Sequence, residues 1–241
     1  MASNRDVLRQ IPLPIQLRPG SVFSSYYAGA NHEALSVLQN LTGTGPNPVI
    51  FLTGISGTGK THLLQAACVA ASEQAQQACY LPLRELHHYG PELLQGTEHM
   101  NLVCLDDVSH ILHQPDWSRA LFNLYREMEE KGGKLLLADA HAPVALAIVL
   151  PDLASRILAG AILRLQPLDE LAQTEALQLH ARLRGLILPD DVLNYILRRL
   201  PRDMHTLCGF LDDMDIASLS SQRKLTVPFV KQVLLEAGTT A

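Results

Sequence analysis

Short apolar runs and helical patterns alternate along the first two thirds of the chain. Five apolar runs have the length of strands that are buried on both faces. They lie at Val49–Thr53, Cys79–Leu83, Leu102–Asp106, Leu135–Ala138 and Ile162–Leu165. Segments with a helical spacing of apolar residues separate them, at residues 33–41, 61–76 and 117–130. This alternation predicts an α/β fold, in which helices cover both faces of a parallel sheet.

The pattern after Pro167 contains helices only. Asp169 is placed to cap a helix that Gly185 ends, and a second helix is expected to start at Pro189. Two more helical patterns occupy residues 202–219 and 226–236. The first 20 residues instead hold prolines without a helical period, which predicts an extended or flexible segment. The chain is therefore expected to divide into a tail (1–20), an α/β domain (21–167) and a small all-α domain (168–241).

The composition is that of an ordinary globular protein, with 47% hydrophobic and 18% charged residues. Its formal net charge of −5 provides no general attraction to a nucleic-acid backbone, so strong direct DNA binding is not expected. No apolar run approaches the roughly 18 residues needed to span a bilayer, and the N-terminus has no apolar signal segment. A cytoplasmic protein without membrane contact is expected. The four cysteines form no CxxC pair and are predicted to be buried, reduced thiols, and the histidines have no metal-ligand spacing.

A glycine-rich motif follows the first apolar run. Residues 54–61 read Gly-Ile-Ser-Gly-Thr-Gly-Lys-Thr and match the P-loop pattern G-x-x-x-x-G-K-[ST] in full. Such glycines let backbone N–H groups surround phosphate oxygens, and the following helix presents its positive N-terminus to them. Lys60 is expected to reach the β- and γ-phosphates, and the Thr61 hydroxyl to bind Mg²⁺. The predicted ADP or ATP site consists of Gly54, Ile55, Ser56, Gly57, Thr58, Gly59, Lys60, Thr61 and His62.

Two carboxylates close the apolar run that starts at Leu102. A P-loop site needs a carboxylate at the tip of a neighbouring strand to hold Mg²⁺ through water, and a second can polarise the attacking water. We assign Asp106 to the metal and Asp107 to the water. Many strands end in aspartate, so the assignment depends on the P-loop about 45 residues upstream.

These motifs resemble a known family. A P-loop α/β domain with an acidic pair and a C-terminal helical domain is similar to an AAA+ ATPase, in which the helical domain forms a lid. Within that group, Gly59–Leu63, Asp106-Asp107 and Val22–Tyr26 resemble the bacterial replication initiator family DnaA. The resemblance covers residues 20–236 and implies further functional positions.

The segment Leu150–Arg156 resembles the DnaA-family segment that bears the arginine finger. In that role Arg156 would act in trans, neutralising charge on the γ-phosphate of a nucleotide held by a neighbouring protein; the alternative is an arginine in a surface salt bridge. Arg202 matches the sensor arginine of the lid, which would contact the chain's own nucleotide. Ala140 falls where a polar sensor residue is expected, with Asp139 one residue earlier, so weak or absent hydrolysis by the chain itself is predicted.

The N-terminal segment carries a second resemblance. Residues 10–15, Gln-Ile-Pro-Leu-Pro-Ile, are similar to the peptide with which bacterial replication proteins dock on the DNA polymerase sliding clamp, the β subunit. Gln10, Leu13 and Ile15 would fill pockets on the clamp, and the prolines limit the entropy lost on binding. No basic helix-turn-helix region follows the lid before Ala241. This organisation resembles that of DnaA-related regulators that self-associate, dock on the clamp and stimulate hydrolysis of DnaA-bound ATP, thereby repressing re-initiation of chromosome replication.

Two other functions stay open. A self-hydrolysing AAA+ ATPase or helicase loader would act on single-stranded DNA, although the sequence has no basic stripe. A small-molecule P-loop kinase would need an acceptor site, which no segment of the sequence indicates.

Overall fold

The computed structural model describes residues 17, 20–41, 48–201, 203–221 and 225–238. Its central feature is a parallel sheet of five strands in the order β2-β3-β4-β1-β5. The strands are β1 (Val49–Thr53), β2 (Ala78–Pro82), β3 (Leu102–Asp106), β4 (Lys134–Asp139) and β5 (Ala161–Arg164). The predicted parallel sheet is confirmed, and each strand lies within one residue of its expected bounds.

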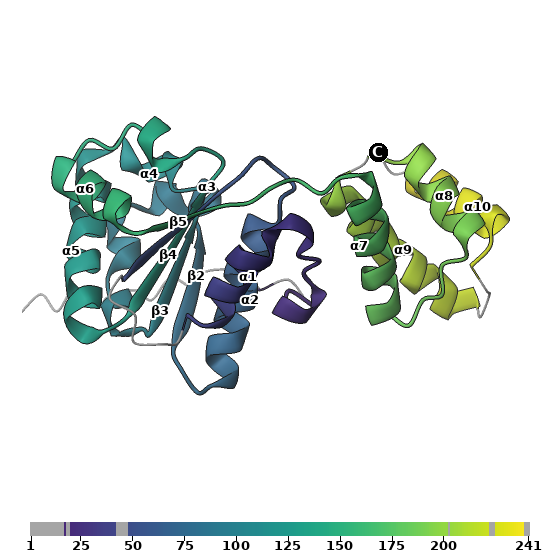
Figure 1. Ribbon diagram of the computed structural model, residues 1–241, viewed down its shortest axis with the longest axis horizontal. Helices are drawn as coiled ribbons and strands as arrows, with labels where there is room; N and C mark the ends of the chain where they lie inside the picture. Colours follow the sequence, from purple (N-terminus) through teal and green to yellow (C-terminus); the bar gives the residue numbers. More distant parts are fainter. Residues whose placement is uncertain (1–16, 18–19, 42–47, 202, 222–224, 239–241) are drawn as a thin grey trace, which may run out of the picture.

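Each face of the sheet packs against its own helices, with α1 and α2 on one side and α5 and α6 on the other (Figure 1). Alternate strand residues supply the two cores: Val49 and Phe51 pack toward α5 and α6, and Ile50 and Leu52 pack toward α2. The helices of this part are α1 (His32–Gln39), α2 (Lys60–Glu73), α3 (Leu83–Leu86), α4 (Ser109–Leu112), α5 (Pro115–Lys131) and α6 (Pro151–Ala159). The 3-10 turns are η1 (Phe23–Ser25), η2 (Gly29–Asn31), η3 (His87–Tyr89), η4 (Pro91–Leu94), η5 (Thr97–His99) and η6 (Pro143–Ala145).

The edge strand β5 departs from the expectation of burial on both faces. Its residues are only partly buried or exposed, and Ile162 is 42% exposed. The reason is its position, because β5 pairs with β1 alone and ends the sheet. The sequence pattern also did not predict α6, whose apolar face is limited to the two buried residues Leu153 and Ile157.

The four remaining helices form a separate bundle, joined to the sheet by an extended connection (Figure 1). They are α7 (Glu170–Leu183), α8 (Asp190–Arg199), α9 (Met204–Ser221) and α10 (Val227–Gly238). The Asp169 side chain accepts a hydrogen bond from Ala172 N at 2.8 Å, and Gly185 takes the left-handed φ of +70° after α7. Both predicted ends of this helix are confirmed. No helix in the described ranges is both long and apolar enough to cross a membrane.

All four cysteines are free thiols. Cys68 and Cys104 are buried as predicted, but Cys79 and Cys208 are only partly buried. Burial raises the pKa of Cys79 to about 12 and that of Cys208 to about 11, so the thiols stay protonated at neutral pH.

Candidate functional site

The carboxyl ends of β1, β3 and β4 meet at one edge of the sheet, and the candidate site is built there. Because β4 lies between the other two, Asp139 stands beside Thr53 in the register and close to the end of β3. The P-loop connects β1 to α2, and Asp106 is the last residue of β3. The topology therefore brings together residues that are more than 80 positions apart in the sequence.

Two glycines of the P-loop occupy positions that a larger residue would obstruct. A Cβ on Gly54 would lie 2.8 Å from Thr58 Oγ1 and 2.9 Å from the Leu165 carbonyl oxygen. A Cβ on Gly59 would lie 2.6 Å from Tyr26 Cε2, and Gly59 also has the left-handed φ of +90°. The loop therefore needs glycine at both positions to keep its backbone path.

Lys60 begins α2 and reaches back across the loop. Its Nζ donates hydrogen bonds to the carbonyl oxygens of Gly54 at 2.6 Å and Ile55 at 3.2 Å. Burial lowers the pKa of the ammonium, and the carboxylates at the neighbouring strand ends oppose that shift. Its direct hydrogen-bond partners are neutral carbonyls and it forms no ion pair among the described residues, so the buried ammonium suits an anionic ligand.

Asp106 and Thr61 lie together at the end of β3. Thr61 Oγ1 donates to Asp106 Oδ2 at 2.6 Å, and the Tyr80 hydroxyl donates to the same oxygen at 3.0 Å. Asp106 is buried, and burial raises the pKa of its carboxyl despite these hydrogen bonds. The pair presents a hydroxyl and a carboxylate, both of which are ligand types that Mg²⁺ prefers.

Asp107 lies beside this pair but has a different partner. Its Oδ2 forms an ion pair with Arg84 Nε at 3.1 Å, and its backbone has the left-handed φ of +56°, which is uncommon for a residue other than glycine. Arg84 belongs to α3, which directly follows β2. The carboxylate predicted to polarise a water is thus paired with an exposed arginine.

Asp139 ends β4 as a buried carboxylate. It accepts hydrogen bonds from Ser109 N at 2.8 Å and from His141 N at 3.0 Å. Burial alone would raise the pKa of its carboxyl, but these hydrogen bonds outweigh burial and lower it. Ala140, predicted to occupy the sensor position, is exposed and has no polar side chain.

The segment before η2 closes over the P-loop. The Tyr26 hydroxyl donates to Thr58 O at 3.1 Å and accepts a hydrogen bond from Asn31 Nδ2 at 3.1 Å. Burial raises the pKa of Tyr26 to about 12, so its phenol stays protonated. His62 is held by the same segment, since its Nε2 lies 3.0 Å from Val22 O and 3.2 Å from Ser25 Oγ. The structure therefore places His62 against residues 22–25.

The lid approaches this segment through α7. The Tyr27 hydroxyl donates to Glu175 of α7, and the His62 ring meets the His180 ring edge-on with centroids 6.5 Å apart. Burial and the nearby Arg184 lower the pKa of His180 to about 4, so its imidazole is neutral at pH 7. A cleft of about 350 Å³ lies between residues 27–32 and the start of α7 with the connection before it. It is lined by Tyr27, Gly29, Ala30, His32, Pro167, Leu168, Asp169, Leu171, Ala172 and Glu175.

Arg156 lies on the exposed side of α6. Its guanidinium carbon stands 5.7 Å from the centroid of the Tyr125 ring on α5, a cation–π contact. None of the ion pairs found among the described residues includes Arg156. We call this region, formed by Tyr125 of α5 and by Leu153, Arg156 and Ile157 of α6, the α5–α6 corner.

Four predicted site residues lie outside the described residues. They are the sensor arginine and the three clamp-binding positions, namely Arg202, Gln10, Leu13 and Ile15.

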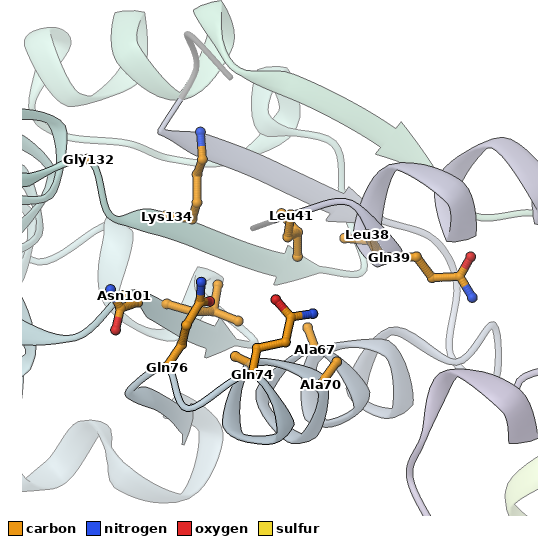
Figure 2. A pocket seen from close by; sticks show the side chains of 12 residues that line it. Leu38, Gln39, Leu41, Ala67, Ala70, Gln74, Gln76, Asn101, Gly132 and Lys134 are labelled. Atoms are coloured by element: carbon orange, nitrogen blue, oxygen red, sulfur yellow. The ribbon is translucent and has the colours of Figure 1, made fainter. Parts of the chain in front are cut away.

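A second pocket, of about 80 Å³, opens at the opposite end of the sheet (Figure 2). Amide and small apolar side chains line it together with the Lys134 side chain, and no acidic residue takes part. Its lining comprises Leu38, Gln39, Leu41, Ala67, Ala70, Ala71, Gln74, Gln76, Asn101, Leu102, Gly132 and Lys134. It lacks the glycine-rich turn and the carboxylates, so the P-loop edge remains the candidate site.

Sequence reasoning missed several residues of the P-loop edge. Tyr80 and Arg84 were not predicted because they belong to β2 and α3, which reach Asp106 and Asp107 only through the folded sheet. Asn31 was missed although it joins η2 to the connection before the lid, donating to Gln166 O at 3.0 Å and accepting from Gln166 N at 2.7 Å. These contacts join segments that are distant in sequence, and no local pattern indicates them.

Two protein-family profiles match the chain. The profile of the bacterial DnaA ATPase domain matches residues 20–164, more than half of the chain, and the profile described as "Hda, lid domain" matches residues 169–234. The chain is therefore an Hda-like, DnaA-related AAA+ protein.

Solved structures share the fold. Domain III of the DnaA protein of Thermotoga maritima has a TM-score of 0.73 and 20% identity, covering 92% of this chain and 98% of that one. AMPPCP-bound DnaA from Aquifex aeolicus has a TM-score of 0.68 and 24% identity, covering 82% of this chain and 66% of that one. A point variant of RuvB from T. maritima has a TM-score of 0.59 and 15% identity, covering 88% of this chain and 72% of that one. The fold is thus an AAA+ core with a parallel sheet and a helical lid.

Proposed function

The chain belongs to the bacterial DnaA ATPase family, and on that premise we propose that it is a nucleotide-binding regulator of the replication initiator DnaA. In this proposal it docks on the sliding clamp, associates with DnaA and further copies of itself, and stimulates hydrolysis of DnaA-bound ATP. The observation that carries the proposal is the joint match of a DnaA ATPase domain and an Hda lid on one chain. Such an activity would repress re-initiation of chromosome replication.

Nucleotide binding is proposed at the P-loop edge. The cradle of Gly54–Thr61, with the buried ammonium of Lys60 bound only to carbonyl oxygens, suits the phosphates of ADP or ATP. Thr61 and Asp106 fit Mg²⁺, because they bring a hydroxyl and a carboxylate within 2.6 Å of one another. Bound Mg²⁺ would neutralise part of the phosphate charge. A. aeolicus DnaA, of the same fold, binds the ATP analogue AMPPCP, which supports an adenine nucleotide as the ligand.

Arg156 is proposed to act on the nucleotide of a neighbouring DnaA molecule. A planar guanidinium can donate two parallel hydrogen bonds to phosphate oxygens, and it stays charged at any physiological pH. The exposure of Arg156 on α6 leaves its donors accessible to a partner.

The chain's own hydrolysis is proposed to be weak. Ala140 provides no polar group at the sensor position, and Arg84 competes for the Asp107 carboxylate that would orient a water. A turnover on the order of 1 s⁻¹ or more by the isolated chain would favour the self-hydrolysing ATPase instead.

The test measures phosphate release from ATP-loaded DnaA with clamp on DNA, adding wild-type protein or a variant. Arginine fingers provide roughly 10³–10⁵-fold in rate, so Arg156→Ala is expected to remove the stimulation. Arg156→Lys should restore little of it, since an ammonium lacks the fork of donors. Arg119→Ala is the matched control, because Arg119 is another exposed arginine, on α5, that pairs with Asp116. Full stimulation by the Arg156→Ala protein would contradict the trans-acting role.

Clamp docking is tested separately with the tail. Gln10→Ala is expected to abolish binding to the sliding clamp in a pull-down and to leave the melting temperature unchanged, because a proline-containing terminal segment is expected to add little to the stability of a fold. Gln16→Ala, one residue beyond the predicted peptide, should bind like wild type. Tight clamp binding by a chain without residues 1–15 would locate the docking site elsewhere.

A further inference from the structure

The α5–α6 corner holds Arg156 in a defined place. Helix α6 packs on α5 through Leu153 and Ile157, whose side chains are 1% and 0% exposed and belong to the same core as Tyr125. These two residues are four positions apart and fix the rotation of α6 about its axis. Arg156 is the neighbour of the buried Ile157 but is itself exposed, and from there its guanidinium reaches Tyr125 of α5.

Tyr125 provides the surface on which the guanidinium rests. The residue is 4% exposed, and the guanidinium carbon of Arg156 lies 5.7 Å from its ring centroid. The Tyr125 hydroxyl donates to Glu129 Oε1, one turn later on α5, at 2.7 Å. The ring also stacks on Phe122, with an interplanar angle of 11°. The ring is therefore held on several sides before the arginine reaches it.

A long exposed arginine loses considerable rotamer freedom when it engages a phosphate. A contact that already restricts the side chain reduces that loss, since fewer conformations remain to be given up on binding. The face of the ring attracts the guanidinium without using N–H donors, and the phenol adds a side-chain hydrogen bond with Arg156. A guanidinium has five N–H donors, so those not engaged by the phenol stay available while the side chain is confined.

We propose that Tyr125 is a positioning residue for Arg156, which it confines over its ring so that the guanidinium is preorganised for a partner's phosphate. The inference rests on the proposed function of Arg156. It adds that α5 contributes to this function through Tyr125. Tyr125 itself has no contact with the nucleotide in this proposal. Glu129 holds the phenol and has a lesser role.

The first test is spectroscopic and needs no partner. The Hε proton of Arg156, assigned by its loss in Arg156→Lys, should show an upfield ring-current shift in wild type and in Tyr125→Phe. The shift should vanish in Tyr125→Leu. A random-coil position of this proton in wild type would overturn the proposal.

The second test is the stimulated hydrolysis of DnaA-bound ATP, titrated with DnaA. Tyr125→Leu should lower the maximal rate about 2- to 30-fold, the range of cation–π energies, with an unchanged half-saturating concentration of DnaA. Tyr125→Phe keeps the ring and should retain most of the rate. Tyr195→Leu is the control, because Arg199 stands at the same 5.7 Å from the Tyr195 ring in α8.

The outcomes separate the two proposals. If Arg156→Ala loses stimulation but Tyr125→Leu keeps the full rate, the positioning role is wrong and the function of Arg156 stands. Equal losses in Tyr125→Phe and Tyr125→Leu would also contradict it, because the ring would then not matter. If Arg156→Ala stimulates fully, the proposed function fails, whereas the ring-current shift still reports the contact. Should Tyr125→Leu unfold at the assay temperature, Tyr125→Met provides a second apolar variant without a ring.

Discussion

The P-loop edge and the α5–α6 corner are built in opposite ways. At the P-loop edge, backbone conformation and buried groups create the site: two glycines at close approach, a buried lysine and a buried carboxylate. At the α5–α6 corner, a single exposed side chain rests on a buried ring. The first arrangement suits a ligand that the chain itself encloses, and the second suits a ligand that a partner presents.

The first prediction separates the two regions by ligand binding. Lys60→Ala removes the cation that faces the phosphates and should weaken nucleotide binding about 10- to 100-fold, as expected for a hydrogen bond to a charged group. Arg156→Ala should leave that affinity unchanged. Lys134→Ala is the control, because Lys134 is a partly buried lysine at the other end of the sheet whose pKa burial also lowers. Calorimetry measures all three, and ordinary affinity in Lys60→Ala would contradict the P-loop assignment.

A second prediction concerns the backbone of the loop. Gly59→Ala combines a positive φ with a Cβ 2.6 Å from Tyr26, and should destabilise the fold by about 2–4 kcal/mol. Gly57→Ala meets no atom within 4 Å and has only the unfavourable φ of +85°, so about 1–2 kcal/mol is expected. Urea denaturation gives both values. Equal losses of unfolding free energy in the two variants would mean that the Tyr26 ring moves aside without cost and does not hold the P-loop closed.

A third prediction concerns the two buried carboxylates, whose contributions to stability respond to pH with opposite sign. The folded pKa of Asp139 is depressed, so it stabilises the fold above its ordinary value of 3.8 and loses this contribution as pH falls through the lower folded value. The folded pKa of Asp106 is raised, so its stabilising form is the protonated one, present below 3.8 and lost as pH rises through the higher folded value.

Asparagine substitutions test this difference at pH 7. Asp139→Asn should destabilise by about 1–3 kcal/mol, because Ser109 N and His141 N donate to different carboxylate oxygens and the amide NH₂ replaces one of them with a group that cannot accept. Asp106→Asn should be neutral or stabilising, since it removes a buried charge. Thermal melts between pH 3 and pH 7 measure both variants against wild type, and destabilisation by Asp106→Asn at pH 7 would contradict the assigned direction.

Local chemistry made much of this protein predictable. The P-loop is a run of eight neighbouring residues whose glycines are required by the backbone path, so Gly54 and Gly59 can be recognised without the fold. The strands carry uninterrupted apolar runs because both faces of the sheet are covered, and Asp169 and Gly185 mark the ends of α7 through local hydrogen bonding and backbone conformation. Such features depend on residues within a few positions of one another.

The partners of the functional side chains were decided by the tertiary structure. Asp107 meets Arg84 because β2 and β3 are neighbours, and His62 meets residues 22–25 because that segment folds over α2. Arg156 rests on Tyr125, 31 positions earlier, because two buried residues dock α6 on α5. Each contact joins elements whose mutual placement follows from packing the whole core, and no local pattern in the sequence carries that information.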